Sequence, residues 1–503
     1  MRVQDAAVLE ERGARIEARL DPSWQEEMAE PMLAGTNLRY EMAARVQAIP
    51  CGGIGLIHEL VGAVKLAEQI DEHVHVFKRH FPYHESDHVL NLTYNVLAGG
   101  TRLEDIERLR SNEGYLDTLG CRRIPDPTTA GDFLRRFAES DVMDLMGAIN
   151  ATRVKVWKKL SRQERKLALI DVDGTIAPTT GECKEGMDIS YKGTWGYAPL
   201  IVSLANTQEV LFTKNRPGNQ PSHSGAVQYL DAAIALARGG GFKRVRLRGD
   251  TNFSLTRHFD RWDESGVEFV FGIDAHPSFV ERAKALADKD WKVLQRPQSV
   301  PSGERSRPLN VKQQIVAERG YTNLVLEEEH IAEFAYTPSH SQETYRMVAL
   351  RKTIRGEQHQ RHLFTETRYF FYVTNVPKKT LSTARVVFEA NARCHQENLI
   401  EQLKNGVQAL RMPSDGLVAN WAYLVVASLA WNLKAWLGIC LPHRKHAHEL
   451  RRMEYRRFLH SVMLLPCQVV NTARRLVLRI LTYSTWAQVL LEALPHFRRW
   501  RMA

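Results

Sequence analysis

The stretch LIDVDGTIAP (residues 169–178) decides the fold, because it combines a short apolar strand with acidic residues at the point where that strand ends. Asp171 lies within the apolar run, whereas Asp173 is followed by Gly174 and Thr175, which are typical of a turn. In α/β sheets, ligands gather beyond the carboxyl ends of the strands. Asp173 is therefore the first candidate site residue, and Asp171 is the open alternative.

A second strand of the same kind, KRVRLRGD (243–250), ends at Asp250. The segment between the two strands contains apolar, β-branched text, PLIVSLANTQEVLFTKN (199–215), and then a helical pattern, SGAVQYLDAAIALAR (224–238). Strands that alternate with helices predict an α/β sheet in which at least some strands are parallel. We therefore expect the side chains of Asp173 and Asp250 to meet at the ends of two strands.

The rest of the chain divides by its hydrophobic pattern. Apolar residues recur at three- and four-residue steps before the core, which predicts helices, whereas a strand-rich stretch after it resembles an insertion. Helical patterns then resume and complete the core. The predicted regions are an N-terminal segment (1–45), a helical region (46–160), the first part of the α/β core (161–287), a β-rich insertion (288–376), the completion of the core (377–440) and a basic helical C-terminal region (441–503).

The composition favours an anionic partner and a reducing compartment. The 503 residues carry a formal net charge of +10, although many proteins with such an excess bind no nucleic acid. The six cysteines form no C-x-x-C pair, which argues against a zinc cluster and against a disulfide framework. The first thirty residues contain no apolar run of the secretory type. We expect a cytoplasmic protein.

The longest apolar stretch, LVANWAYLVVASLAWNLKAWLG (417–438), contains Asn420, Asn432 and Lys434. These polar groups would be costly inside a bilayer, whereas a helix in the core of a large protein can satisfy them. We predict a buried core helix and no membrane contact.

A third acid lies on the predicted helix RCHQENLIEQLKNG (393–406). On a helical wheel, Arg393, Glu397 and Lys404 fall on one flank of the apolar stripe, at the border between core and solvent, and Glu401 points further out. In isolation this pattern is typical of a solvated charged face.

Together with two strand-end aspartates, however, Glu397 would complete a set of oxygen ligands of the kind that Mg²⁺ or Mn²⁺ prefers. Two such ions about 3.5–4 Å apart can activate an attacking hydroxyl and stabilise the leaving oxygen when a phosphodiester is cleaved. Basic neighbours would hold the nucleic-acid backbone, and Arg248, beside Asp250, is a candidate for a phosphate contact, although an arginine at a strand end is more often an ordinary ion-pair partner.

At this point the chain resembles the bacterial insertion-sequence transposases of the DDE type. That family carries a signature in which Tyr, Arg, Glu and Lys are separated by two, three and six residues, and Arg393, Glu397 and Lys404 match its last three members. The position of the tyrosine is occupied by Ala390, so one phosphate contact of the family is missing. The two family aspartates map to Asp173 and Asp250.

The resemblance extends from about residue 46 to 440 and implies a fold and a function. The fold would be an RNase H-like core interrupted by the β-rich insertion, with a helical N-terminal region that binds DNA and a helical C-terminal region. The three acids would bind two Mg²⁺ or Mn²⁺ ions, while Arg393 and Lys404 position phosphates. The reaction would be cleavage at transposon ends followed by strand transfer. The partners would be double-stranded transposon ends and target DNA, bound by a dimer in the bacterial cytoplasm at the nucleoid.

Three alternatives stay open. A phosphatase of the haloacid-dehalogenase type would use Asp171 as nucleophile and Asp173 as acid or base, but Phe253 and Ser254 stand where a further acid would follow Asp250. It would also leave the insertion and the basic tail unexplained. The other two are a DDE-fold nuclease without strand transfer and a DNA-binding protein that does not cut.

One further segment, YKGTWGYAPL (191–200), mixes aromatic and basic residues as proteins that bind single-stranded nucleic acid do. A β-hairpin that places some of these rings on the surface explains the same pattern. We prefer the hairpin.

Overall fold

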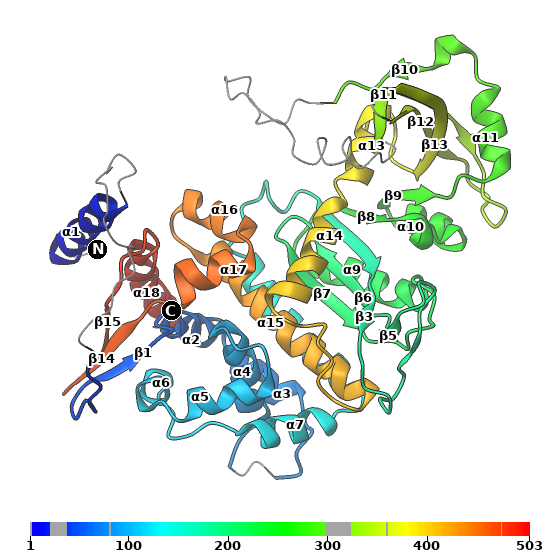
Figure 1. Cartoon of the computed structure of the whole chain (residues 1–503). Helices are drawn as coiled ribbons and strands as arrows, with labels where there is room; N and C mark the ends of the chain where they lie inside the picture. The colour runs from blue at the N-terminus through cyan, green and yellow to red at the C-terminus, as the bar shows by residue number, and fades with distance from the viewer. Residues whose placement is uncertain are drawn as a thin grey trace.

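The computed structural model describes residues 3–20, 38–79, 82–296, 323–358, 361–473 and 475–502, and its centre is a nine-stranded mixed sheet (Figure 1). Five neighbouring strands form the core of this sheet. β6 is antiparallel to both of its neighbours, β7 and β2, whereas β2, β8 and β9 are parallel. In sheet order they are β7 (Glu209–Lys214), β6 (Leu200–Leu204), β2 (Ala168–Gly174), β8 (Val245–Gly249) and β9 (Val267–Ile273). The predicted α/β class with parallel strands is confirmed.

The parallel connections run through helices, as such connections require. α9 (Ala226–Gly239) joins β7 to β8, and α10 (Phe259–Glu264) joins β8 to β9. All residues of β6 and of β8 are buried, which agrees with strands that are covered on both faces.

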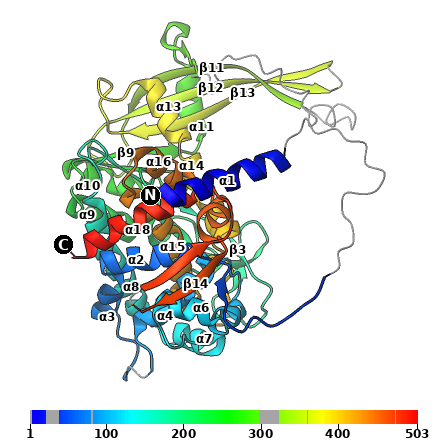
Figure 2. The same ribbon diagram turned by 90° about the vertical axis from the view of Figure 1, so that its left-hand side faces the viewer.

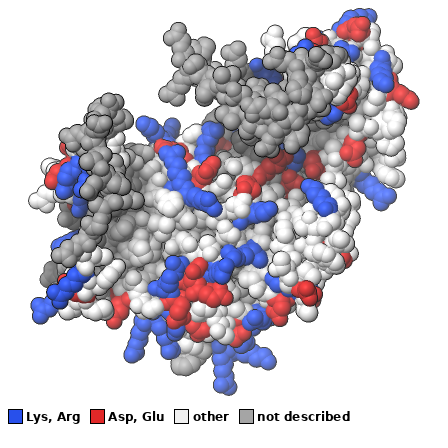
Figure 3. All heavy atoms as spheres, viewed as in Figure 1, with Lys and Arg blue, Asp and Glu red and all other residues white. Residues whose placement is uncertain are grey.

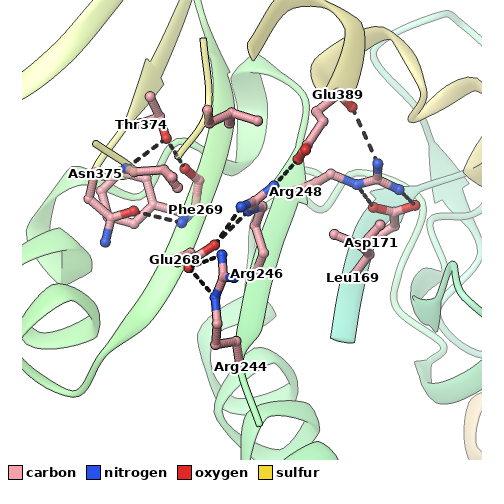
Figure 4. A network of polar contacts seen from close by, with 12 residues as sticks. Leu169, Asp171, Arg244, Arg246, Arg248, Glu268, Phe269, Thr374, Asn375 and Glu389 are labelled. Atoms are coloured by element: carbon pink, nitrogen blue, oxygen red, sulfur yellow. Dashed lines mark hydrogen bonds and ion pairs between the residues drawn. The ribbon is translucent and has the colours of Figure 1, made fainter. Parts of the chain in front are cut away.

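The insertion continues the central sheet and is not a separate layer. It consists mainly of β11 (Asn323–Tyr336), β12 (Tyr345–Gln358) and β13 (Arg361–Thr374), which pair antiparallel in that order. β13 then pairs antiparallel with β9 of the core. The side chain of Asn375 accepts a hydrogen bond from the backbone N–H of Phe269 at 2.9 Å, which fastens the base of the insertion to β9 (Figure 4).

Two further elements belong to this part of the chain. α11 (Pro277–Lys284) and β10 (Lys292–Val293) precede the long strands, and β10 pairs with β11 at the edge of the sheet. The predicted insertion also includes residues 297–322, which lie outside the described residues.

The N-terminal region is helical, as its hydrophobic pattern predicts. Its second-last helix shows how a boundary arises: the Asp126 carboxylate accepts a hydrogen bond from the Thr129 N–H at 2.9 Å, and Pro127 occupies the first helical position. The helices that follow the 3-residue strand β1 (Gln47–Ile49) are α2 (Ile54–Val64), α3 (Leu66–His73), α4 (Glu85–Leu97), α5 (Ile106–Arg110), α6 (Glu113–Leu119), α7 (Pro127–Arg135) and α8 (Glu139–Trp157).

The apolar stretch that begins at Leu417 forms α15 (Leu417–Cys440), which is long and apolar enough to cross a membrane but is completely buried inside the protein over its most apolar window. Its polar residues have partners. Asn432 accepts a hydrogen bond from the Val210 N–H at 2.9 Å and donates one to the Val210 carbonyl at 3.0 Å. Lys434 donates to the Arg451 carbonyl at 3.1 Å and lies over the ring of Trp431. The predicted core helix is confirmed.

A buried ionic cluster around Glu209 joins three parts of the chain. Glu209 on β7 pairs with Arg153 of α8 at 2.9 Å, and both side chains are completely buried. Its carboxylate also accepts hydrogen bonds from the indoles of Trp157 on α8 and Trp436 on α15, at 2.8 and 2.7 Å. A buried carboxylate is tolerated only when it is paired and hydrogen-bonded, so this cluster fixes the N-terminal helices and α15 against the edge of the core.

The C-terminal region contains a β-hairpin in addition to the expected helices. β14 (Cys467–Thr472) and β15 (Arg475–Ile480) pair with each other. β14 also pairs with β1, which precedes the N-terminal helices. The alternating burial of β15 explains the strand, since every second residue is exposed. The prediction of a purely helical tail was therefore incomplete. The helices of this region are α16 (Arg444–Arg452), α17 (Tyr455–Phe458) and α18 (Ala487–Met502).

Figure 2 shows that α18 lies beside α1 (Val3–Arg19), so the two ends of the chain meet on one side of the molecule. α1 also packs against the segment between β15 and α18, because a Cβ added to Gly13 of α1 would lie 3.1 Å from the ring of Tyr483.

Glu209→Gln should lower the free energy of unfolding by about 3–5 kcal/mol, because it leaves the Arg153 charge buried without its carboxylate. The matched control is Glu107→Gln, which removes a carboxylate from an exposed ion pair with Arg110 and should cost about 1 kcal/mol or less. Urea denaturation followed by tryptophan fluorescence measures both. Equal effects of the two changes would contradict a structural role for the Glu209 cluster.

Candidate active site

The two acidic strand ends lie side by side on one face of the sheet. Asp171 and Asp173 alternate along β2 and so point to the same face, and Arg248 and Asp250 do the same along and just beyond β8. The parallel register places Asp171 beside Arg248. Two residues further on, Asp173 is therefore level with Asp250, as the sequence predicted.

Asp171 is not accessible to a ligand. Its carboxylate accepts two hydrogen bonds from Arg248, at 2.6 Å from Nε and 2.8 Å from Nη2, and both side chains are almost completely buried (Figure 4). Asp173 is the more accessible of the two aspartates, with 13% of its side chain exposed against 1% for Asp171. The predicted nucleic-acid contact of Arg248 does not fit the structure, because its guanidinium is enclosed in the protein and engaged by Asp171.

The same buried face holds the helix that leads to Glu397. Arg246 of β8 pairs with Glu268 of β9 at 2.6 Å and also with Glu389, which lies on α13 (Thr383–Asn391) (Figure 4). Arg248 reaches the carbonyl of Glu389 at 3.4 Å. These contacts fasten α13 to β8. Glu389 was not predicted from the sequence, because its partners Arg246 and Arg248 come from a strand far away in the sequence.

A second missed residue is Gln396 of α14 (Cys394–Glu401), whose side chain is 1% exposed. It donates a hydrogen bond to the Ile201 carbonyl at 3.1 Å and accepts one from the Ser203 hydroxyl, so it fixes α14 on β6. The signal was present in the sequence, because Gln396 precedes Ile400 and Leu403 by one and two helical turns and so occupies a position of the apolar stripe.

Asp173 lies at the centre of the site, with 13% of its side chain exposed. Its Oδ1 accepts a hydrogen bond from the Gly174 N–H at 2.8 Å, and its Oδ2 accepts one from Nη1 of Arg393 at 2.9 Å. Burial raises the pKa of Asp173 to about 6; the Arg393 charge acts to lower it, whereas the negative charges of Asp250 and Glu397 raise it further. Asp250 and Glu397 therefore both lie close enough to Asp173 to act on it electrostatically.

Arg393 connects two of the three acids. Its Nη2 lies 3.3 Å from Oε1 of Glu397, so one guanidinium bridges Asp173 on β2 and Glu397 on α14. Glu397 is more exposed, with 59% of its side chain accessible. Asp250 accepts a hydrogen bond from the Asn252 N–H at 2.9 Å and thereby caps the short 3-10 helix η2 (Thr251–Phe253). In this arrangement, no three His, Cys, Asp or Glu side chains of the described residues converge on one point as metal ligands do.

The predicted helix over 393–406 forms from Cys394 onward, but it is not α-helical throughout. Ala392 and Arg393 form a turn between α13 and α14, and the last part is a π-helical turn, η5 (Gln402–Gly406). Gly406 is packed against Tyr455, since an added Cβ would lie 2.9 Å from that side chain. Lys404 lies in this π-helical turn and is exposed, so it remains accessible to a partner.

Ala390 occupies the position of the signature tyrosine, and a tyrosine from another element packs against the same apolar cluster. Ala390 packs against the apolar cluster under α13 together with Tyr372 of β13. Burial raises the pKa of Tyr372 to about 12, and Arg393 is close enough to act against that rise. The Tyr372 side chain, which comes from the insertion, therefore lies within electrostatic range of Arg393.

The preferred hairpin in the segment 191–200 is confirmed. β4 (Asp188–Ile189) pairs with β5 (Trp195–Tyr197), and β3 (Ala177–Pro178) pairs with the other edge of β5. Tyr191 and Trp195 are exposed, at 82% and 54%. The hairpin borders an open cleft of about 1170 Å³, whose basic lining residues are Arg102, Lys184 and Arg411.

Residues 48–502 match the family model described as transposase DDE domain group 1. Because this match covers most of the chain, the protein belongs to this family of DDE transposases, whose catalytic domain is RNase H-like. The match agrees with the resemblance in the sequence and, together with the burial of Asp171, argues against the phosphatase alternative.

No curated protein matches the sequence. Among solved structures, the chain is similar to a piggyBac transposase in a synaptic complex with hairpin DNA. The identity is 9%, 80% of each chain is covered, and the TM-score is 0.33. Because this TM-score is low, the family assignment rests on the sequence match alone.

Asp171→Asn and Asp173→Asn should have opposite effects on stability. Asp171→Asn leaves the Arg248 charge buried without its carboxylate and should cost about 3–5 kcal/mol. Asp173→Asn should leave stability unchanged or raise it, because a folded-state pKa above the ordinary value means that folding favours the neutral form.

The upward shift of the Asp173 pKa predicts how the stability of the protein depends on pH. In the wild-type protein the contribution of Asp173 is present below its ordinary pKa of 3.8 and is lost as the pH rises through about 6. The Asp173→Asn variant should therefore have a higher free energy of unfolding than the wild type at pH 8. This difference should shrink as the pH falls towards 5, as measured by urea denaturation. A variant that is less stable than the wild type at pH 8 would contradict this assignment.

Proposed function

We propose that this protein is a transposase that cleaves phosphodiester bonds at the ends of a mobile element and joins the freed 3′-hydroxyl to target DNA. The observation that carries the proposal is that Asp173, Asp250 and Glu397, which are remote in sequence, share one electrostatic neighbourhood in a chain of the DDE family. Binding-only and nuclease-only members of the same fold are distinguished by experiment below.

The chemistry of the donors fits a divalent cation, although the three carboxylates do not converge on one point in this structure. Carboxylate oxygens are the ligands that Mg²⁺ and Mn²⁺ prefer, and a cation would relieve the repulsion that Asp250 and Glu397 exert on Asp173. Asp173, Asp250 and Glu397 would hold the ions. When bound, a pair of such ions supplies activation of the attacking hydroxyl and stabilisation of the leaving oxygen.

The basic residues around the acids would bind the DNA backbone. Arg393 lies between two of the acids, and the exposed Lys404 follows Glu397 by two helical turns. Figure 3 shows acidic side chains gathered over α14 in the middle of this face, with lysine and arginine side chains on either side. Phosphates held by the basic groups would lie across the acids. The affinity for DNA should then fall steeply as the salt concentration rises.

The hairpin with Trp195 is close enough to contribute to the same DNA path. The Thr179 N–H donates to the Trp195 carbonyl at 3.2 Å, and Thr179 follows Asp173 by only six residues. Six extended residues span at most about 20–22 Å, so the cleft beside the hairpin is within roughly six or seven nucleotides of the site. We further propose that the N-terminal helices bind the element ends, that two copies act together on paired ends, and that the protein works at the bacterial nucleoid.

Glu397→Gln should abolish Mn²⁺-dependent cutting of DNA that carries the element's terminal inverted repeats, while DNA binding is retained. The reason is that the amide removes one of three carboxylate ligands but leaves the basic surface unchanged. Electrophoresis of end-labelled DNA measures nicking and joining, and a gel-shift titration measures binding. The matched control is Glu401→Gln on the next turn of the helix, which should cut at close to the wild-type rate.

The outcomes separate the alternatives. Cutting that survives Glu397→Gln would falsify the three-acid assignment. Cutting without joined products identifies a nuclease, whereas binding without any cutting in Mg²⁺ or Mn²⁺ identifies a binding protein.

A further inference from the structure

We propose that Arg393 acts as an exchangeable counterion: it holds Asp173 and Glu397 in ion pairs in the DNA-free protein, and it must release both acids before they can hold a divalent cation. On release it would pair with a DNA phosphate. This inference rests on the proposed function, because it takes these two acids as cation ligands.

The geometry is that of direct competition. Nη1 of Arg393 lies 2.9 Å from Oδ2 of Asp173, and Nη2 lies 3.3 Å from Oε1 of Glu397. A guanidinium is a planar fork that presents its N–H groups in fixed directions, so this one takes up the space between the two carboxylates. A cation that binds the same oxygens would need that space.

The charges lead to the same conclusion. The positive charge of Arg393 favours the ionised form of Asp173, and Asp250 and Glu397 oppose it. A divalent cation would perform the same neutralisation with twice the charge. Because like charges repel at short distance, the guanidinium and the cation would exclude one another from these oxygens.

Arg393 is also more accessible than the other arginine of the site. It lies in the short turn between α13 and α14, and 20% of its side chain is exposed. Arg248 and Asp171 are only 3% and 1% exposed. The site therefore contains two arginine–aspartate pairs, one enclosed and structural, the other at the surface and able to exchange partners.

The test is Mn²⁺ binding to the full-length protein without DNA, measured from the electron paramagnetic resonance signal of free Mn²⁺. Arg393→Met should bind Mn²⁺ about tenfold more tightly than the wild type, since the competing charge is gone. The matched control is Arg385→Met, which removes an exposed arginine of α13 and should leave the affinity within about twofold. Thermal melts establish that both variants fold.

A second variant separates bridging from charge. Arg393→Lys keeps the positive charge but offers one ammonium in place of two guanidinium nitrogens, so it should show an intermediate affinity. A short duplex should also raise the Mn²⁺ affinity of the wild type more than that of Arg393→Met, because only the wild type has an arginine to transfer from the acids to a phosphate.

The results distinguish the failure of this inference from the failure of the proposed function. If Mn²⁺ binding depends on Asp173 and Glu397 but Arg393→Met does not strengthen it, the exchange is wrong and the metal site stands. If substitution of either acid leaves Mn²⁺ binding unchanged, the metal site and the exchange are both wrong. A tenfold gain in Arg393→Met with no gain in Arg385→Met supports the exchange.

Discussion

The site depends on the buried ion pair between Asp171 and Arg248. It joins β2 and β8 with two hydrogen bonds of 2.6 and 2.8 Å and fixes their parallel register. That register alone determines that Asp173 and Asp250, each two residues further along its strand, reach the same level at the end of the sheet. A slip by one residue would turn one of the two acids to the opposite face. In the sequence, Asp171 and Arg248 look like site residues. In the structure, they form the ion pair that positions Asp173 and Asp250.

The helix that supplies the third acid is held by the same kind of contact. Glu389 pairs with Arg246 of β8, and Gln396 bonds to β6, so α13 and α14 are attached on both sides of the turn that carries Arg393. At the other edge of the sheet, Glu209 ties α8 and α15 to β7. Buried polar groups stabilise only the arrangement in which all of them are satisfied, so these contacts give the sheet one placement for each helix. The insertion shares this framework, because β13 extends the sheet directly from β9.

The sequence predicts the parts of this structure that depend on local pattern. Apolar strands that end at Asp173 and Asp250, a capped helix at Pro127, and a core helix at Leu417 can each be recognised within about twenty residues. What it does not predict is which distant charges meet in the interior. Arg248 looks like a surface base until its partner is known, and the hairpin at Cys467–Ile480 finds its place only by pairing with β1, more than four hundred residues away. Such pairings are decided by tertiary packing, which a wheel or a strand pattern does not contain.

The contrast between the two arginine–aspartate pairs shows how one motif serves two purposes. In the enclosed pair, the low dielectric surroundings make separation of the charges costly, and the contact is permanent. In the pair between Arg393 and Asp173, 20% and 13% of the two side chains are exposed, so their charges are less costly to separate than those of the enclosed pair. The site therefore combines one fixed ion pair, which holds the strands in register, with one more accessible ion pair. Asp171, in the enclosed pair, and Asp173, in the more accessible pair, are only two residues apart along β2.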